Sequence, residues 1–104
     1  MCLGLEQVED MDHISVRVNG NSMWPTLVDG EIIDFVITEK KFKNGQIVLA
    51  KHPFNNDLMI IKRIKSISEK GIFLEGDNPD PTATDDSHNF GLVPKEHVLG
   101  IANS

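Results

Sequence analysis

The sequence predicts an all-β fold, mainly antiparallel, built as a small coiled or partly closed sheet. Segments of alternating apolar and polar residues follow one another along the chain, and two of the joints carry the pairs Asp29-Gly30 and Asn44-Gly45. These pairs readily adopt the positive φ angles of tight turns between antiparallel strands. Two such turns close together predict a meander, in which strands adjacent in sequence are also neighbours in the sheet.

The expected strands differ in how they are buried. Residues 31–37 are apolar at nearly every position, so we expect that strand to be buried on both faces.

Residues 76–91 form a long loop rich in turn residues, and such a loop in a small domain is usually functional. Residues 1–12 are acidic and aperiodic, which indicates a flexible lead-in. The expected strands cover residues 14–18, 31–37, 46–51, 60–65, 71–75 and 98–101.

Length and charge narrow the class of protein. A chain of 104 residues is expected to form a single domain, residues 1–104. Its net charge of −6, with scattered basic residues, argues against binding nucleic acid, which needs a concentrated basic patch. No apolar run reaches the roughly 18 residues of a membrane span, and the acidic start does not resemble a signal peptide. We therefore expect a soluble cytoplasmic protein with no membrane anchor.

Neither a metal nor another cofactor is expected. The single cysteine, Cys2, has no partner for a disulfide or a thiolate zinc site, and it fits a reducing compartment. The four histidines lack the spacing of metal ligands and are expected at the surface. The carboxylates of residues 76–91 do not follow the ligand pattern of a calcium-binding EF-hand loop.

The stretch from Asn19 to Leu27 places Ser22 between an expected strand and a turn. Gly20 tolerates backbone angles closed to other residues, and Pro25 fixes its own φ. A serine held there has a defined direction, with open backbone N–H groups beside it at Gly20, Asn21 and Ser22. These N–H groups could hold the oxyanion of a reaction at Ser22. The alternative interpretation is an ordinary polar turn.

Lys62 is the basic residue of the most informative strand. Because side chains alternate along a strand, Lys62 shares its face with Ile60 and Ile64. It is either desolvated between them or reaches water from an edge strand. A desolvated lysine can be neutral and can take the proton of a serine hydroxyl, so Ser22 and Lys62 are the predicted catalytic pair, meeting across neighbouring strands. A Ser-His-Asp triad is disfavoured because the Gly-x-Ser-x-Gly motif is absent.

Four motifs in order resemble the type I signal peptidases, serine proteases of the S26/S24 superfamily that use a lysine as base. The resemblance covers roughly residues 14–101. The motifs are Ser-Met-x-Pro-Thr-Leu at 22–27, Asn-Gly-Gln-Ile-Val at 44–48, Ile-Lys-Arg-Ile at 61–64, and Gly-Asp-Asn at 76–78 with Asp-Ser-x-x-Phe-Gly-x-Val-Pro at 86–94.

The chain lacks the membrane anchor and the large insertion of signal peptidases, and in this it is similar to the nickel-type superoxide dismutase maturation proteases. That resemblance implies a Ser-Lys endopeptidase that removes an N-terminal extension from a protein precursor, in this case the nickel superoxide dismutase precursor. The precursor segment is expected to bind as an extended peptide beside residues 14–20 and the lysine strand. The resemblance also implies that Thr84 orients the lysine and that Asp86 is a structural acid. His88 stands where the family usually has arginine.

Two other functions stay open. A LexA-type domain, which cleaves its own linker or dimerises as a regulator, shares the Ser-Lys core. Such a domain would follow a DNA-binding helix-turn-helix and carry an Ala-Gly or Cys-Gly bond, and neither dipeptide occurs here. A non-catalytic peptide-binding module is the third possibility, and it would be favoured if Ser22 and Lys62 lay far apart.

Overall fold

The computed structural model describes residues 13–37, 42–80, 82 and 85–102. The expected lead-in, residues 1–12, lies outside them. The described strands form one six-stranded sheet in which every strand pair is antiparallel, so the all-β prediction is confirmed. The strands are β1 (His13–Arg17), β2 (Ile32–Val36), β3 (Ile47–His52), β4 (Asn55–Ser68), β5 (Gly71–Glu75) and β6 (Val98–Ala102), and the short helical elements are α2 (Ser87–Phe90) and η2 (Lys95–His97).

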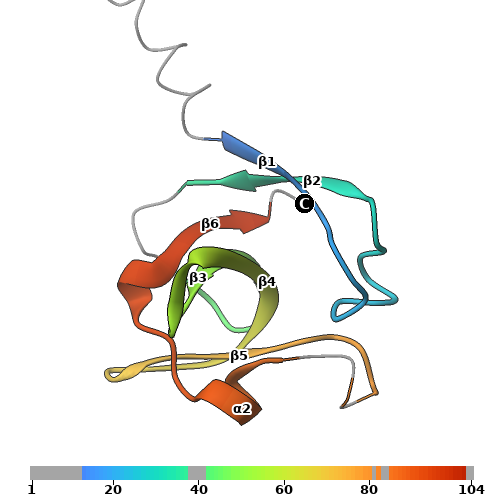
Figure 1. Cartoon of the computed structure of the whole chain (residues 1–104). Helices are drawn as coiled ribbons and strands as arrows, with labels where there is room; N and C mark the ends of the chain where they lie inside the picture. Colours follow the sequence, from blue (N-terminus) through green and yellow to red (C-terminus); the bar gives the residue numbers. More distant parts are fainter. Residues whose placement is uncertain (1–12, 38–41, 81, 83–84, 103–104) are drawn as a thin grey trace, which may run out of the picture.

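The strand order, β1-β2-β6-β3-β4-β5, differs from the predicted meander. β6, the last strand in sequence, lies between β2 and β3 (Figure 1). Gly100 makes this insertion possible, because a Cβ atom there would lie 3.0 Å from Phe35 Cβ and 3.1 Å from the Val36 carbonyl oxygen. A larger residue at position 100 would push β6 away from β2.

The sheet is coiled but open, with β1 and β5 as its edges. Figure 1 shows β1 and β2 on one side of the coil, and β5 with α2 on the opposite side. β4 pairs with β5 only from Arg63 to Ser68, so in the described part of the chain Asn55 and residues 59–62 pair with β3 alone. Among the described residues, the edge of β1 away from β2 and the edge of the first half of β4 away from β3 therefore pair with no strand.

Two apolar clusters support this arrangement. The larger cluster joins β3, β4 and β5 to α2. The smaller cluster lies beneath the turn that follows β1, and it consists of Val18, Met23 and Leu27 with Ile33, Ile47 and Ile61 packed against them. The buried members of the larger cluster are Val48, Ala50, Ile64, Ile72, Leu74, Phe90 and Val93.

The expectation that residues 31–37 are buried on both faces is wrong. Phe35 is fully buried, but Ile32 is 62% exposed and Asp34 is also exposed. In the described part of the chain no element covers the outer face of β2. The apolar composition of this segment therefore predicted more burial than the structure shows.

Candidate active site

Ser22 lies in a turn whose two ends are tied together. The amide of Val18 donates to the Glu31 carbonyl at 2.7 Å, and the amide of Gly30 donates to the Val18 carbonyl at 2.8 Å. Within the turn, Met23 is 1% and Leu27 5% exposed, so the residue next to Ser22 is anchored in the smaller apolar cluster. The Trp24–Pro25 peptide bond is cis. The turn that carries Ser22 is thus held by backbone hydrogen bonds at its two ends and by the burial of Met23 and Leu27 in the smaller apolar cluster.

Gly20 has a φ of +92°, an angle that favours glycine. The amide of Gly20 donates to Asp29 Oδ1 at 2.7 Å, so the expectation that this N–H group is open is wrong. Among the described residues, the amides of Asn21 and Ser22 donate to no protein group. Those two N–H groups are the ones left to bind an oxyanion.

Lys62 Nζ donates a hydrogen bond to Ser22 Oγ at 2.9 Å, which confirms the predicted proximity of the two side chains. Lys62 is 5% exposed and lies opposite Val48 of β3. On the same face of β4, Ile64 is buried and Ile60 packs against the larger apolar cluster. The predicted apolar flanks of Lys62 are therefore also confirmed.

Burial lowers the pKa of Lys62 below its ordinary value of 10.5, because an apolar environment disfavours the charged ammonium. The negative charges of Asp86 and Asp85 act in the opposite direction, and their effect is smaller. No carboxylate of the described residues forms an ion pair with Nζ. Burial without a paired carboxylate favours the neutral Lys62 amine, and the Ser22 hydroxyl is the proton donor within its reach.

Asn78 holds the serine turn from the segment that follows β5. Its backbone amide donates to the Ser22 carbonyl at 2.9 Å, and its side-chain Nδ2 donates to the Asn21 carbonyl at 2.7 Å. Both bonds go to the two residues whose amides are open. Sequence reasoning used Asn78 only as part of a motif and did not find this contact.

Asp77 joins the same turn to β4. Its carboxylate accepts two hydrogen bonds from the Arg63 guanidinium, at 2.8 and 2.7 Å, and one from the Thr26 hydroxyl at 2.7 Å. The Arg63 pair is the main cause that lowers the pKa of Asp77 below its ordinary value, with Thr26 adding to it. Because Arg63 is next to Lys62 in sequence, this bridge fixes the serine turn relative to the lysine strand.

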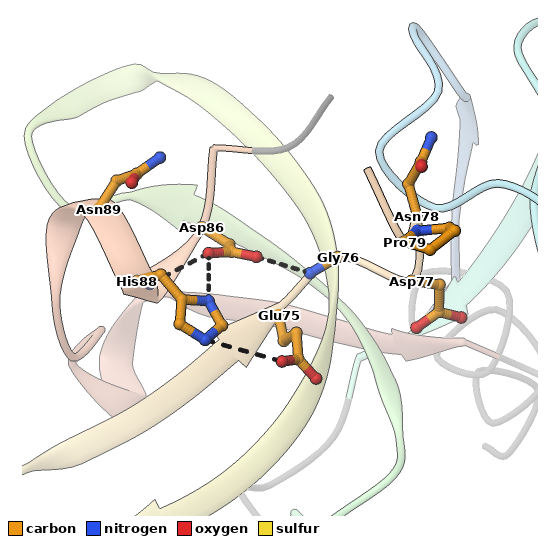
Figure 2. Close-up of a pocket in the computed structure, with 8 residues that line it drawn as sticks. All are labelled: Glu75, Gly76, Asp77, Asn78, Pro79, Asp86, His88 and Asn89. Atoms are coloured by element: carbon orange, nitrogen blue, oxygen red, sulfur yellow. Dashed lines mark hydrogen bonds and ion pairs between the residues drawn. The ribbon is translucent and has the colours of Figure 1, made fainter. Parts of the chain in front are cut away.

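Asp86 anchors the segment on the other side of Gly76, as Figure 2 shows. It is 5% exposed, caps α2 by accepting from the His88 amide at 3.0 Å, and accepts from the Gly76 amide at 3.0 Å. His88 Nδ1 lies 2.9 Å from the same carboxylate, and its Nε2 lies 3.8 Å from Glu75 (Figure 2). His88 thus reaches both carboxylates. These contacts are those of a structural acid, and Thr84 lies outside the described residues.

His52 contradicts the expectation that all four histidines are at the surface. Its side chain is 12% exposed and meets the Phe90 ring at a centroid distance of 4.8 Å. Its Nε2 also lies 3.5 Å from an Asp85 carboxylate oxygen. Within the described ranges no group of three His, Cys, Asp or Glu side chains could hold a metal ion.

A pocket of about 260 Å³ opens beside Ser22, between β1 and the first half of β4. Its walls are mostly apolar, and Leu58 and Met59 are about half exposed there. The pocket lies where the two unpaired strand edges face each other. Its lining residues are Val16, Arg17, Val18, Asn19, Ser22, Met23, Leu49, Leu58, Met59 and Ile61.

The chain matches the family model described as Peptidase S24-like over residues 3–93. It belongs to this family. The match supports the S24/S26 superfamily part of the resemblance, and it indicates a serine-type peptidase or a LexA-like self-cleaving domain. No curated protein matches the chain significantly. Among the described residues, no helix has the length and apolar character required to span a membrane.

Proposed function

We propose that this S24-like domain is an endopeptidase with a Ser22-Lys62 catalytic dyad. The observation that carries the proposal is the contact of 2.9 Å between the buried Lys62 Nζ and Ser22 Oγ. A serine hydroxyl is a weak nucleophile until a neighbouring base takes its proton. The geometry also disfavours a non-catalytic peptide-binding module, which has no need for a buried lysine at this serine.

The reaction follows the logic of acyl transfer. The neutral Lys62 amine accepts the Ser22 hydroxyl proton while Oγ attacks the scissile carbonyl carbon. The resulting oxyanion accepts hydrogen bonds from the open amides of Asn21 and Ser22. The Lys62 ammonium then gives its proton to the leaving amine, and the peptide bond breaks. Water, deprotonated by Lys62, hydrolyses the acyl-enzyme and restores both side chains.

The substrate binds as an extended strand in the slot between β1 and the first half of β4. Both of these segments present an unpaired backbone edge, and the pocket beside Ser22 lies between them. An unpaired edge offers N–H and C=O groups to an incoming strand. Backbone pairing on one or both edges would hold the scissile bond at a fixed register next to Ser22.

The precursor of a nickel superoxide dismutase is the proposed substrate, on the strength of the sequence resemblance. A cytoplasmic location belongs to the same proposal. The test is to incubate this protein with the precursor from the cell that produces both, and to identify the new N-terminus by mass spectrometry. Cleavage at one position that is lost with Ser22→Ala supports the proposal. An intact precursor beside a cleaved control peptide would point to another peptide substrate.

Self-cleavage is the second candidate, because the matched family is the S24-like one. The Ala-Gly and Cys-Gly dipeptides of such domains do not occur in the 104 residues. Intact-mass measurement of the chain alone, incubated at increasing pH, separates the two functions. Fragments that form at a rate independent of protein concentration, and that do not form with Ser22→Ala, would favour self-cleavage. An unchanged mass would favour a substrate supplied by another protein.

A further inference from the structure

We propose that the peptide substrate carries an acidic side chain next to Arg17, between apolar residues that enter the Ser22 pocket. The inference rests on the proposed peptidase function and on strand addition at β1. Arg17 would then be a specificity-determining residue, and the preferred sequence would alternate apolar, acidic and apolar.

The alternation follows from the geometry of β1 and of Val18, the residue directly after it. Val18 is buried at 4% and Val16 is half-buried, whereas Arg17 between them is exposed. In a sheet, residues side by side on neighbouring strands point to the same face. A peptide paired with β1 therefore directs the residues beside Val16 and Val18 into the pocket. The residue between them points outward, next to Arg17.

The inward positions favour aliphatic side chains. Leu49, Met59 and Ile61 line the pocket together with the two valines. The pocket volume of about 260 Å³ is limited, so small or medium apolar side chains fit it best. Charged side chains at these positions would lose their hydration without gaining a partner.

Arg17 is the one charged residue among the described residues that line this pocket. Its antiparallel partner on β2 is Ile32, which cannot neutralise it. The nearest carboxylate along that strand, Asp34, accepts a hydrogen bond from Ser15. Among the described residues Arg17 forms no ion pair, whereas Arg63 and Lys65 pair with Asp77 and Glu75.

A guanidinium without a counter-ion at the mouth of an apolar pocket selects a carboxylate. Its planar donors match the two oxygens of Asp or Glu, and the pair can be bidentate. Because this position is exposed, the preference should be modest, on the order of three-fold per charged pair, and weaker at high salt.

The test is to cleave a degenerate peptide library with the unmutated chain, Arg17→Glu and Arg17→Gln, and to sequence the products. We expect Asp and Glu to be enriched about three-fold at one position whose two immediate neighbours in the peptide select apolar residues. Arg17→Glu should switch that preference to Lys and Arg, and Arg17→Gln should abolish it. Lys70→Glu is the matched control, because Lys70 is exposed and does not line the pocket, and it should change nothing.

Four outcomes would overturn the inference. Cleavage without an acidic preference, or a preference that Arg17→Glu leaves unchanged, would contradict the role of Arg17 while the peptidase function stands. The same switch in Lys70→Glu would show that net charge, and not Arg17, sets the preference. Cleavage no higher than that of Ser22→Ala would overturn the peptidase function itself, and this inference with it.

Discussion

Ser22 Oγ and Lys62 Nζ lie 2.9 Å apart although 40 positions separate these residues in sequence. Ser22 comes from the turn after β1, at one edge of the sheet, and Lys62 comes from the fifth strand in the spatial order, β4. Their contact depends on the coiling of the sheet, which brings the first half of β4 back toward the serine turn. The bridges from Asp77 and Asn78 then fix that turn in place.

The buried amine of Lys62 should cost the fold stability. Its pKa is lowered in the folded state, so the unfolded chain binds more protons between the lowered value and 10.5. The penalty is complete below the lowered pKa and disappears as the pH rises toward 10.5. Lys62→Met should therefore raise the free energy of unfolding at pH 7 by about 1 kcal/mol while it abolishes activity.

Chemical denaturation of both proteins between pH 6 and 10 checks this prediction, within the pH range over which both stay folded. The advantage of Lys62→Met should shrink as the pH rises. A variant that is less stable than the unmutated chain at every pH would show that the Lys62 hydrogen bond outweighs its desolvation.

Asp86 should tune the basicity of Lys62. Its negative charge raises the pKa of Lys62, so Asp86→Asn should lower that pKa further and move the midpoint of the pH–rate profile to lower pH. Asparagine keeps one side-chain oxygen that can cap α2 but loses the acceptor of the Gly76 amide, so thermal unfolding of the variant is measured alongside its rate. Asp57→Asn, at an exposed position, is the control. A midpoint that stays in place or moves upward with Asp86→Asn would contradict this electrostatic coupling.

The Asp77–Arg63 pair should make stability depend on acid pH. The pKa of Asp77 is lowered in the folded state, so its contribution is complete above the ordinary value of 3.8 and is lost as the pH falls through the lowered value. Asp77→Asn should cost about 1 to 2 kcal/mol at pH 7, because the pair is only partly exposed.

Unfolding measured from pH 7 down to pH 3 tests the Asp77 prediction. The difference between the unmutated chain and Asp77→Asn should narrow toward the acid end, while the pH dependence of Asp57→Asn should follow that of the unmutated chain. A constant difference at every pH would mean that Asp77 acts through packing and not through its charge.

Much of the fold followed from local patterns. The strand at residues 71–75 has its predicted bounds, and the turns at Gly30 and Gly45 have the positive φ expected of them. The position of β6 could not be read in this way, because it depends on the non-local approach of Gly100 to Phe35. α2 was not predicted either, since a helix of four residues has no period of its own and depends on the Asp86 cap.

The two central residues of the candidate site, Ser22 and Lys62, could be predicted from their local sequence. Alternation along one strand distinguished Lys62 from Arg63, and the turn residues around Ser22 pointed to it as the proposed nucleophile. The Asn78 clamp, meaning its two hydrogen bonds to the Asn21 and Ser22 carbonyls, was not predictable. Hydrogen bonds to backbone carbonyls leave no pattern in the sequence. The hydrogen bond from the Gly20 amide to the Asp29 carboxylate was missed because it joins residues nine positions apart, and such a contact leaves no local pattern.

Asn78→Ala should reduce kcat more than it reduces binding. It removes the side-chain hydrogen bond to the Asn21 carbonyl, at 2.7 Å, and so loosens the peptide that carries the open amides. A loss of about ten-fold or more in kcat is expected, as for groups that position an oxyanion site. Asn89→Ala is the matched control, because Asn78 and Asn89 both line a second pocket, of about 450 Å³ (Figure 2). The Asn89 side chain bonds only to Asp85 among the described side chains. Equal losses in the two variants would contradict the clamp.

The rate at which a fluorophosphonate probe modifies Ser22, measured against pH by mass spectrometry, tests the central claim most directly, because it needs no knowledge of the substrate. If Lys62 is the base, the rate should rise with pH around a midpoint well below 10.5, since burial lowers the pKa of Lys62. Lys62→Arg and Lys62→Met should lose the reaction by a factor on the order of 10⁴, because neither supplies a neutral amine. Lys65→Ala, at an exposed position of the same strand, should retain it. Equal modification of Ser22 in the unmutated chain and in Lys62→Met would contradict the Ser-Lys mechanism.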